Sequence, residues 1–393
     1  MSMVAFPFKA EPAEVALANL ETAARHPAIS RVLAVGAEEN QLFAHLRRHS
    51  TGFDTPVDVV VQERIGSRRP GKGDGMNTAL RRFLETDLER LHFYDADITN
   101  FDDSWIDGAE RAADSGYPIV RHFFSRASTD AMITWMITRP LFAIGHPDTV
   151  LWRIRQPLGG ELLLRRDVVE ELVTDELVGS RSDWGIDTVL TYATARSGRP
   201  IYEHHVASGK QHTLYGSLDE LRQMAYECFE AATEISRLPP PPSLRHRVEP
   251  ECPAPPAIAH RVGYDVESTL GLLTAAWSPA EEEAAAKLPP HLGGPLLANR
   301  SGISFAFLDA DRWLEMLVAL RDLYRPEAGW RDLLFRAWVA RVLAYTATDA
   351  LAGHARAMEL LESTVHGYAA WAGGAQATDS KATAATPSPS PRP

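Results

Sequence analysis

Short apolar runs alternate with longer amphipathic segments over the first half of the chain. The apolar runs predict strands at residues 4–8, 31–36, 57–62 and 91–94, and the segments 11–26, 38–48 and 74–85 predict the helices between them. Strands that are apolar along their whole length are typical of a parallel sheet with helices on both faces. We therefore expect an α/β domain built on a Rossmann-like, mostly parallel sheet.

The second half of the chain has helical spacing instead. From about residue 218 apolar residues recur on one helical face, as Leu334, Trp338 and Val342 do. A proline-rich stretch at about 239–256 predicts a stiff connector, and the Ala, Thr, Ser and Pro residues from 373 onward predict a disordered tail. The patterns predict an α/β domain over 1–217, an α-helical domain over 218–372 and a tail over 373–393.

The amino-acid composition limits the classes of molecule that the chain is expected to bind. The 393 residues include 40 Lys and Arg against 52 Asp and Glu, and the net charge is −12. Such an acidic chain is a poor general binder of nucleic acid or of an anionic membrane, so a phosphate must be bound by a local basic pocket. No signal-peptide pattern is present, and the longest apolar stretch, 131–145, is too short to span a bilayer. With two cysteines interpreted as reduced thiols, the sequence predicts a cytoplasmic protein that binds neither nucleic acid nor membrane.

Polar residues follow three of the expected strands directly. Lys9, Gln62 and Asp95 each lie just past a strand, and ligands of parallel sheets bind beyond these carboxyl ends. Asp95 and Asp97, two residues apart, can hold a divalent cation and leave coordination sites open for a diphosphate. A second such pair begins at Asp309, but it precedes a helical segment, so helix capping is its expected role.

A glycine-rich loop separates the third strand from the next helix. Gly66, Gly71 and Lys72 have the spacing of a P-loop, but Gly73 replaces the Ser or Thr that would hold Mg²⁺. The spacing keeps an NTPase open as an alternative, and a flexible surface turn is another. We favour contact of Lys72 with a phosphate, because a lysine at a helix start suits an anion.

The segment 126–134 combines groups that suit a small hydroxy acid. Arg126 offers a planar fork for a carboxylate, and Asp130 and Thr134 share one helical face. A capped helix with a surface arginine is the alternative interpretation.

Three further sites stay open on the residues alone. The glycines of Gln156–Glu161 indicate either a close backbone approach or a bulge. Asp187 at a helix start is either a cap or a carboxylate that faces a sugar. His212, after the last strand of the α/β half, could complete a metal site begun by Asp97.

Taken together, the motifs resemble the mannosylglycerate synthase family of retaining, GT-A-fold glycosyltransferases. The resemblance rests on FPFK at 6–9, RPGKGDGMNTALR at 69–81, HFYDADIT at 92–99, RASTDAMITWMITR at 126–139, QPLGGELL at 156–163, RSDWGIDT at 181–188, LYG at 214–216 and RVGYDVE at 261–267. It extends to about residue 371. It implies transfer of mannose from GDP-mannose to D-glycerate with retention, which gives α-mannosylglycerate, a compatible solute.

The resemblance also implies site residues in this chain. For the nucleotide sugar they are Pro7, Lys9, Glu11, Gln62, Lys72, Asp95, Leu158, Asp187 and Tyr215. For a divalent cation, Mg²⁺ or Mn²⁺, they are Asp97 and His212. For the acceptor they are Arg126, Asp130, Ala131, Met132, Ile133 and Thr134. Of all these, Asp187, Leu158 and Arg126 would lie at the reacting groups.

No residue is compelling as a nucleophile for retention by double displacement. Asp187 is the one candidate, and we expect it to orient sugar hydroxyls while glycerate attacks from the front face. Three alternatives remain: a glucosyltransferase that uses GDP-glucose and glycerate, a P-loop-like NTPase, and a nucleotide-sugar binding protein without turnover. Apolar faces in the helical half would allow a homo-oligomer, although no pattern specifies a symmetry.

Overall fold

The computed structural model describes residues 1–212, 216–298 and 305–384. Eight strands form one sheet: β1 Ser2–Phe8, β2 Ile29–Gly36, β3 Val57–Val61, β4 Arg90–Phe93, β5 Ile119–Phe123, β6 Leu162–Arg165, β7 Ile201–His205 and β8 His246–Val248. The helices that accompany the sheet are α1 Ala13–Arg25, α2 Gln41–His49, α3 Lys72–Leu84, α4 Asp103–Asp114, α5 Arg139–Gly145, α6 Arg166–Thr174, α7 Glu176–Gly179, α8 Gly185–Arg196 and α9 Arg222–Ile235. The later helices are α10 Pro256–Ala259, α11 Val266–Thr274, α12 Pro279–Ala286, α13 Pro290–Ala298, α14 Ala310–Leu323, α15 Ala328–Thr348 and α16 His354–Ala384.

The sheet has the order β3-β2-β1-β4-β6-β5-β7-β8 and is parallel except for β6, which runs antiparallel to β4 and β5. The expected mostly parallel α/β sheet is therefore confirmed. The sequence interpretation missed β5, whose residues are all buried although Arg121 and His122 are polar. Because β6 is reversed, its beginning lies at the same edge of the sheet as the ends of the parallel strands.

The alternation of side chains along β1 explains why this strand is apolar throughout. Met3 and Ala5 belong to one hydrophobic cluster, which includes side chains of α3, α6 and α8. Val4 and Phe6 belong to another, which includes side chains of α1, α2 and α4. Both faces of the strand are thus covered, and an apolar residue is needed at every position.

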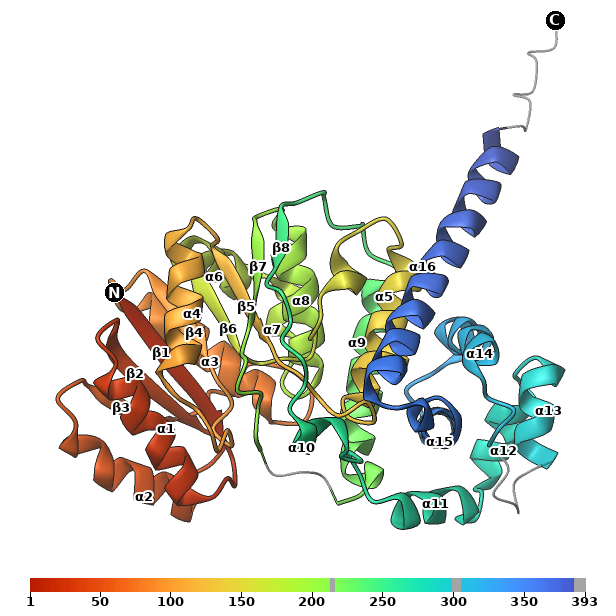
Figure 1. Ribbon diagram of the computed structural model, residues 1–393, viewed down its shortest axis with the longest axis horizontal. Helices are drawn as coiled ribbons and strands as arrows, with labels where there is room; N and C mark the ends of the chain where they lie inside the picture. The colour runs from red at the N-terminus through yellow and green to blue at the C-terminus, as the bar shows by residue number, and fades with distance from the viewer. Residues whose placement is uncertain (213–215, 299–304, 385–393) are drawn as a thin grey trace, which may run out of the picture.

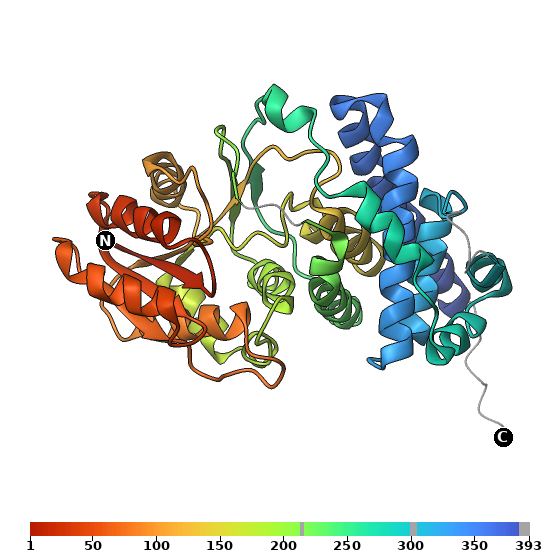
Figure 2. The same ribbon diagram turned by 90° about the horizontal axis from the view of Figure 1, so that it is seen from below.

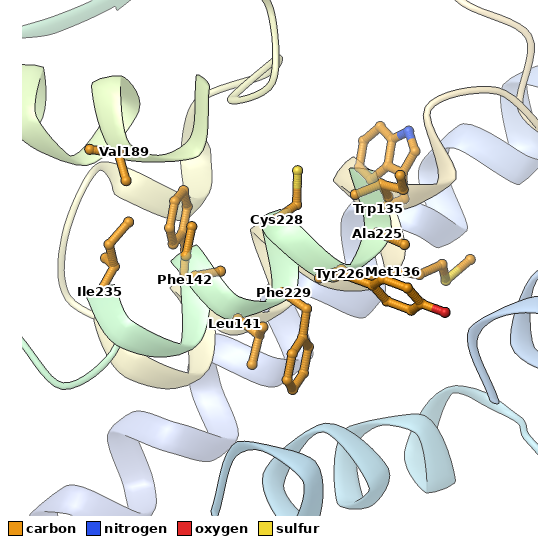
Figure 3. Close-up of a cluster of buried hydrophobic side chains, with 14 of the residues drawn as sticks. Trp135, Met136, Leu141, Phe142, Val189, Ala225, Tyr226, Cys228, Phe229 and Ile235 are labelled. Carbon is orange, nitrogen blue, oxygen red and sulfur yellow. The ribbon is translucent and has the colours of Figure 1, made fainter. Parts of the chain in front are cut away.

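The C-terminal helices pack at the end of the molecule opposite β2 and β3 (Figures 1 and 2). α15 and α16 lie beside α5 and α9, which join this region to the sheet. Figure 3 shows part of the shared core: Phe142 of α5 lies with Val189 of α8 and Ile235 of α9, and Leu141 of α5 lies beside Phe229 of α9. The expected α-helical C-terminal region is confirmed, and it shares one continuous hydrophobic core with α8 and α9.

Two boundaries differ from the sequence interpretation. The proline-rich connector contains β8, which adds a parallel edge strand beside β7. Helix α16 continues to Ala384, past Gly373, where the tail was expected to begin; alanine, the best helix former, recurs in this stretch. Among residues 1–212, 216–298 and 305–384, no helix is both long and apolar enough to cross a membrane.

Candidate active site

The expected site residues converge at one edge of the sheet. Lys9 follows β1, Gln62 follows β3, Asp95 follows β4 and Arg126 follows β5. Glu161 precedes the reversed strand β6 and reaches the same edge. Since β1 has β2 on one side and β4 on the other, this edge is also the point where the strand order changes direction, which is the usual ligand site of such sheets.

Lys72 is the charged centre of this edge. Its Nζ lies 3.0 Å from Asp95 Oδ1 and 3.1 Å from Asp187 Oδ2. Burial disfavours the charged lysine, but Asp187 and Asp95 outweigh it and raise the pKa of Lys72 well above its usual range. A Cβ at Gly160 would lie only 2.5 Å from Lys72 Nζ, so this glycine permits the close approach.

Asp187 does not cap its helix. No side-chain hydrogen bond caps α8, and the carboxylate pairs with Lys72 instead. The residue is 1% exposed, and its Oδ1 has no hydrogen-bond partner. Burial raises the pKa of Asp187, although Lys72 acts in the opposite direction. The structure therefore favours the interpretation of Asp187 as a site carboxylate with an oxygen left for a ligand.

Sequence reasoning missed a second lysine. Lys210 Nζ lies 2.6 Å from Asp95 Oδ2 and 2.5 Å from Glu161 Oε1, and its side chain is 6% exposed. Although burial opposes ionisation, Lys210 and Lys72 together lower the pKa of Asp95 well below its usual range. Burial raises the pKa of Glu161. The available signal was a charged residue beside a glycine turn, at Gly209-Lys210 and Gly160-Glu161.

Arg121 on β5 was also missed. Its guanidinium is buried and contacts the carbonyls of Gln156 and Gly159 at 3.4 and 3.2 Å. It therefore supports the glycine turn that approaches Lys72.

The two aspartates of the 95–97 motif have different surroundings. Both oxygens of Asp95 are paired with lysines, whereas Asp97 Oδ1 is buried and has no hydrogen-bond partner. Asp97 Oδ2 lies 4.0 Å from His212 Nδ1. An unpartnered carboxylate oxygen beside an imidazole is a donor set that fits a divalent cation. Within the described part of the chain, no three His, Cys, Asp or Glu side chains are grouped so that they could hold one.

The second aspartate pair has the expected structural role. Asp309 Oδ1 accepts a hydrogen bond of 2.9 Å from the backbone N–H of Arg312 at the start of α14.

The glycine-rich loop is packed against the segment 181–183 and does not form an open phosphate cradle. The N–H groups of Ile65 and Gly66 donate to Asp74 Oδ1 at 3.1 and 2.8 Å. The N–H of Asp74 donates to Ser182 O at 3.0 Å, and a Cβ at Gly66 would lie 2.7 Å from Ser182 N. Since these backbone donors are satisfied within the protein, they are not available to a phosphate. This geometry disfavours the P-loop interpretation.

Pro7 and Gln62, two further residues expected at the nucleotide sugar, both lie beside α3. Gln62 Oε1 and Pro7 Cβ both lie about 3.4 Å from the Cβ position of Gly75 on α3. Lys9 is exposed, and its N–H donates to Glu11 Oε2 at 2.6 Å. Burial raises the pKa of Glu11. Leu158 is half-buried against the main core, and Tyr215 lies outside the described residues.

The segment after β5 brings Arg126 and Asp130 together. Arg126 Nη1 donates to Asp130 Oδ2 at 3.0 Å, while Arg126 Nε is buried without a hydrogen-bond partner. Burial by itself would raise the pKa of Asp130. The charge of Arg126 and the N–H of Ala131 act more strongly in the opposite direction, so the pKa lies below its usual value. Burial lowers the pKa of His212, and the charges of Lys210 and Arg126 lower it further.

The turn at Ala131 is strained. Among the described residues, Ala131 is the one non-glycine residue with a positive φ, at 55°. This conformation costs on the order of 1 kcal/mol and persists only where the surroundings impose it. The chain then enters a π-helical segment, η2 (Thr134–Thr138), a form that is frequent at functional sites. The side chains of Met132 and Ile133 lie in the core, so these two residues can meet an acceptor only through their backbone.

Two family models match this chain. Residues 2–234 match the family model "Mannosylglycerate synthase, GT domain", and residues 258–365 match "Mannosylglycerate synthase C-terminal domain". A mannosylglycerate synthase of Rhodothermus marinus is 48% identical over 367 residues, which is 92% of each chain. One of Selaginella moellendorffii is 42% identical over 374 residues, which cover 93% of this chain and 89% of that protein.

Among solved structures, a glucosyl-3-phosphoglycerate synthase of Mycobacterium tuberculosis in complex with Mn²⁺, UDP and its product is similar with a TM-score of 0.49 and 18% sequence identity. The match covers 61% of this chain and 81% of that chain.

Proposed function

Because the chain belongs to the mannosylglycerate synthase family and is a glycosyltransferase that makes mannosylglycerate, we propose that it transfers mannose from GDP-mannose to D-glycerate with a divalent cation at Asp97 and His212. The observation that supports this most strongly is the charge pattern after β4. Asp95 is neutralised by two lysines, while Asp97 keeps an unpartnered oxygen next to His212. The carboxylate of Asp95 is thus occupied by contacts within the protein, and that of Asp97 has an oxygen available to a ligand.

Lys72 and Lys210 define the place of the diphosphate. Both are held in fixed positions by buried carboxylates, so their charge needs no reorganisation when a phosphate arrives. The diphosphate would share the edge with Lys72, and Asp187 would accept hydrogen bonds from sugar hydroxyls. Preorganised charge of this kind stabilises the negative charge that develops on the leaving GDP.

A cation bound by Asp97 and His212 would act as a Lewis acid on the diphosphate oxygens. Two protein ligands leave the other coordination positions to the diphosphate and water.

For stereochemistry we propose front-face attack with retention. The bond from C1 to the phosphate oxygen breaks while the glycerate hydroxyl bonds to C1 on the same face, and its proton passes to the leaving phosphate. Asp187 is held by Lys72, and in this mechanism it orients the sugar. If Asp187→Ala retains some retaining turnover and forms no covalent adduct, a double displacement through this residue is excluded.

Release of GDP from GDP-mannose, measured with and without D-glycerate and with Mg²⁺ or EDTA, tests the proposal. We expect release that needs both glycerate and metal. Release without glycerate would indicate hydrolysis, and no release with bound donor would indicate another acceptor or a binding protein. GDP-glucose in the same assay distinguishes the donor sugar.

Two asparagine variants separate the metal site from a structural aspartate. Asp97→Asn should abolish the response to Mg²⁺. Asp309→Asn should not change it, because asparagine also caps a helix well. An equal response of the two variants would contradict the assignment of Asp97.

A further inference from the structure

The acceptor segment, residues 126–136, receives hydrogen bonds from side chains more than 170 residues away in the C-terminal helices. Tyr345 Oη donates to the carbonyl of Ser128 at 2.9 Å, and His354 Nε2 donates to that of Arg126 at 2.9 Å. Trp338 Nε1 and Trp313 Nε1 donate to the carbonyls of Met132 and Met136 at 3.4 and 2.6 Å. Carbonyls along the whole segment are therefore held from the helical region.

A backbone contact adds to these bonds. The N–H of Gly263, which precedes α11, donates to Thr129 Oγ1 at 2.9 Å. A Cβ at Gly263 would lie 2.9 Å from Thr129 O and 3.0 Å from Asp130 Cα, so the chain approaches too closely here for any other residue. The strained φ of Ala131 is found directly beside this contact.

From these contacts we infer that the C-terminal helical region sets the conformation of the acceptor segment, with Tyr345, His354 and Gly263 as positioning residues for the acceptor. The inference rests on the proposed acceptor site at Arg126. Their hydrogen bonds to the acceptor segment end on Arg126, Ser128 and Thr129. We therefore expect these three residues to affect binding of the acceptor far more than binding of the donor.

Tyr345 and Tyr368 form a matched pair for the test. Both are buried tyrosines whose hydroxyl donates to a backbone carbonyl, and the carbonyl that accepts from Tyr368 is that of Ala310, inside the helical region. Replacement of either by Phe removes one such hydrogen bond. Tyr345→Phe should raise the KM for D-glycerate about five- to tenfold and leave the KM for GDP-mannose unchanged, whereas Tyr368→Phe should leave both unchanged.

Equal changes in the two variants, or an equal rise of both KM values in Tyr345→Phe, would overturn the inference. Hydrogen exchange of residues 126–136 provides a measurement that does not depend on the acceptor. Exchange should be faster in Tyr345→Phe than in the wild type and in Tyr368→Phe, and unchanged exchange would overturn the inference. Failure of the wild type to use glycerate would instead refute the proposed function, and it would leave this exchange test intact.

Discussion

The donor site and the acceptor segment lie at the same edge of the sheet, but they are held in different ways. In the donor site, side chains hold side chains: Lys72 and Lys210 are placed between buried carboxylates. In the acceptor segment, neutral donors such as Tyr345 hold backbone carbonyls. The difference indicates that fixed charge can be built from residues near the strand ends, whereas the backbone path that we propose for a small acceptor is held by a second structural region.

Loss of Lys72 should have the largest effect and should be confined to the donor site. In Lys72→Met a preorganised charge next to the leaving diphosphate is removed, and kcat/KM should fall about 10²- to 10³-fold. The KM for glycerate should change little, because the ion pairs of Lys72 within the described residues are with Asp95 and Asp187 and not with residues 126–136. Steady-state kinetics with each substrate varied in turn measures both values.

Lys287 provides the control for this substitution. Its side chain is exposed and pairs only with Glu283 in the same helix among the ion pairs of the described residues. Lys287→Met should keep wild-type kinetics. A large rise in the KM for glycerate in Lys72→Met would show that the two regions are not separable.

The pH dependence should separate the regions further. Burial raises the pKa of Asp187 above the usual value of about 3.9, and Lys72 partly counteracts this. The carboxylate is protonated below its pKa, so kcat/KM should fall at acid pH with a midpoint above 3.9, by about tenfold per pH unit. Because a nearby cation favours the ionised form, Lys72→Met should move this midpoint to higher pH. An unchanged or lower midpoint in the variant would contradict the assignment to Asp187.

The proximity of Lys72 and Asp95 could be predicted from the sequence because both positions follow from local rules. Lys72 and Asp95 are charged residues at a helix start and at a strand end, and the topology of a parallel sheet brings such positions together. Lys210 escaped this reasoning because it lies 115 residues from Asp95, and no spacing rule connects them. Its position depends on β5 and on the reversed strand β6, and β5 was itself not recognised.

The acceptor segment could be recognised as a sequence motif, but the distant residues that hold its backbone could not. Arg126 and Asp130 are charged residues four positions apart, whereas Tyr345 is 217 residues away from its partner Ser128. The sequence pattern predicts only that a tyrosine on an apolar helix face is a core residue. It does not indicate which backbone carbonyl the hydroxyl contacts. Gly263 was part of a motif that resembled the family, but only the structure shows which backbone it approaches.

The smallest effect, and the most selective one, should come from Gly263→Ala. The added Cβ must displace the backbone at Thr129 and Asp130, which lie 2.9 and 3.0 Å away, so the KM for glycerate should rise about threefold to tenfold. Gly271→Ala in α11 is the control, because a Cβ there meets no atom within 4 Å and should only strengthen the helix slightly. The KM for GDP-mannose should remain at the wild-type value in both variants, since the donor site is held by its own charges. If Gly263→Ala weakened both substrates equally, the donor site would also depend on the helical region, and the distinction between the two regions would be wrong.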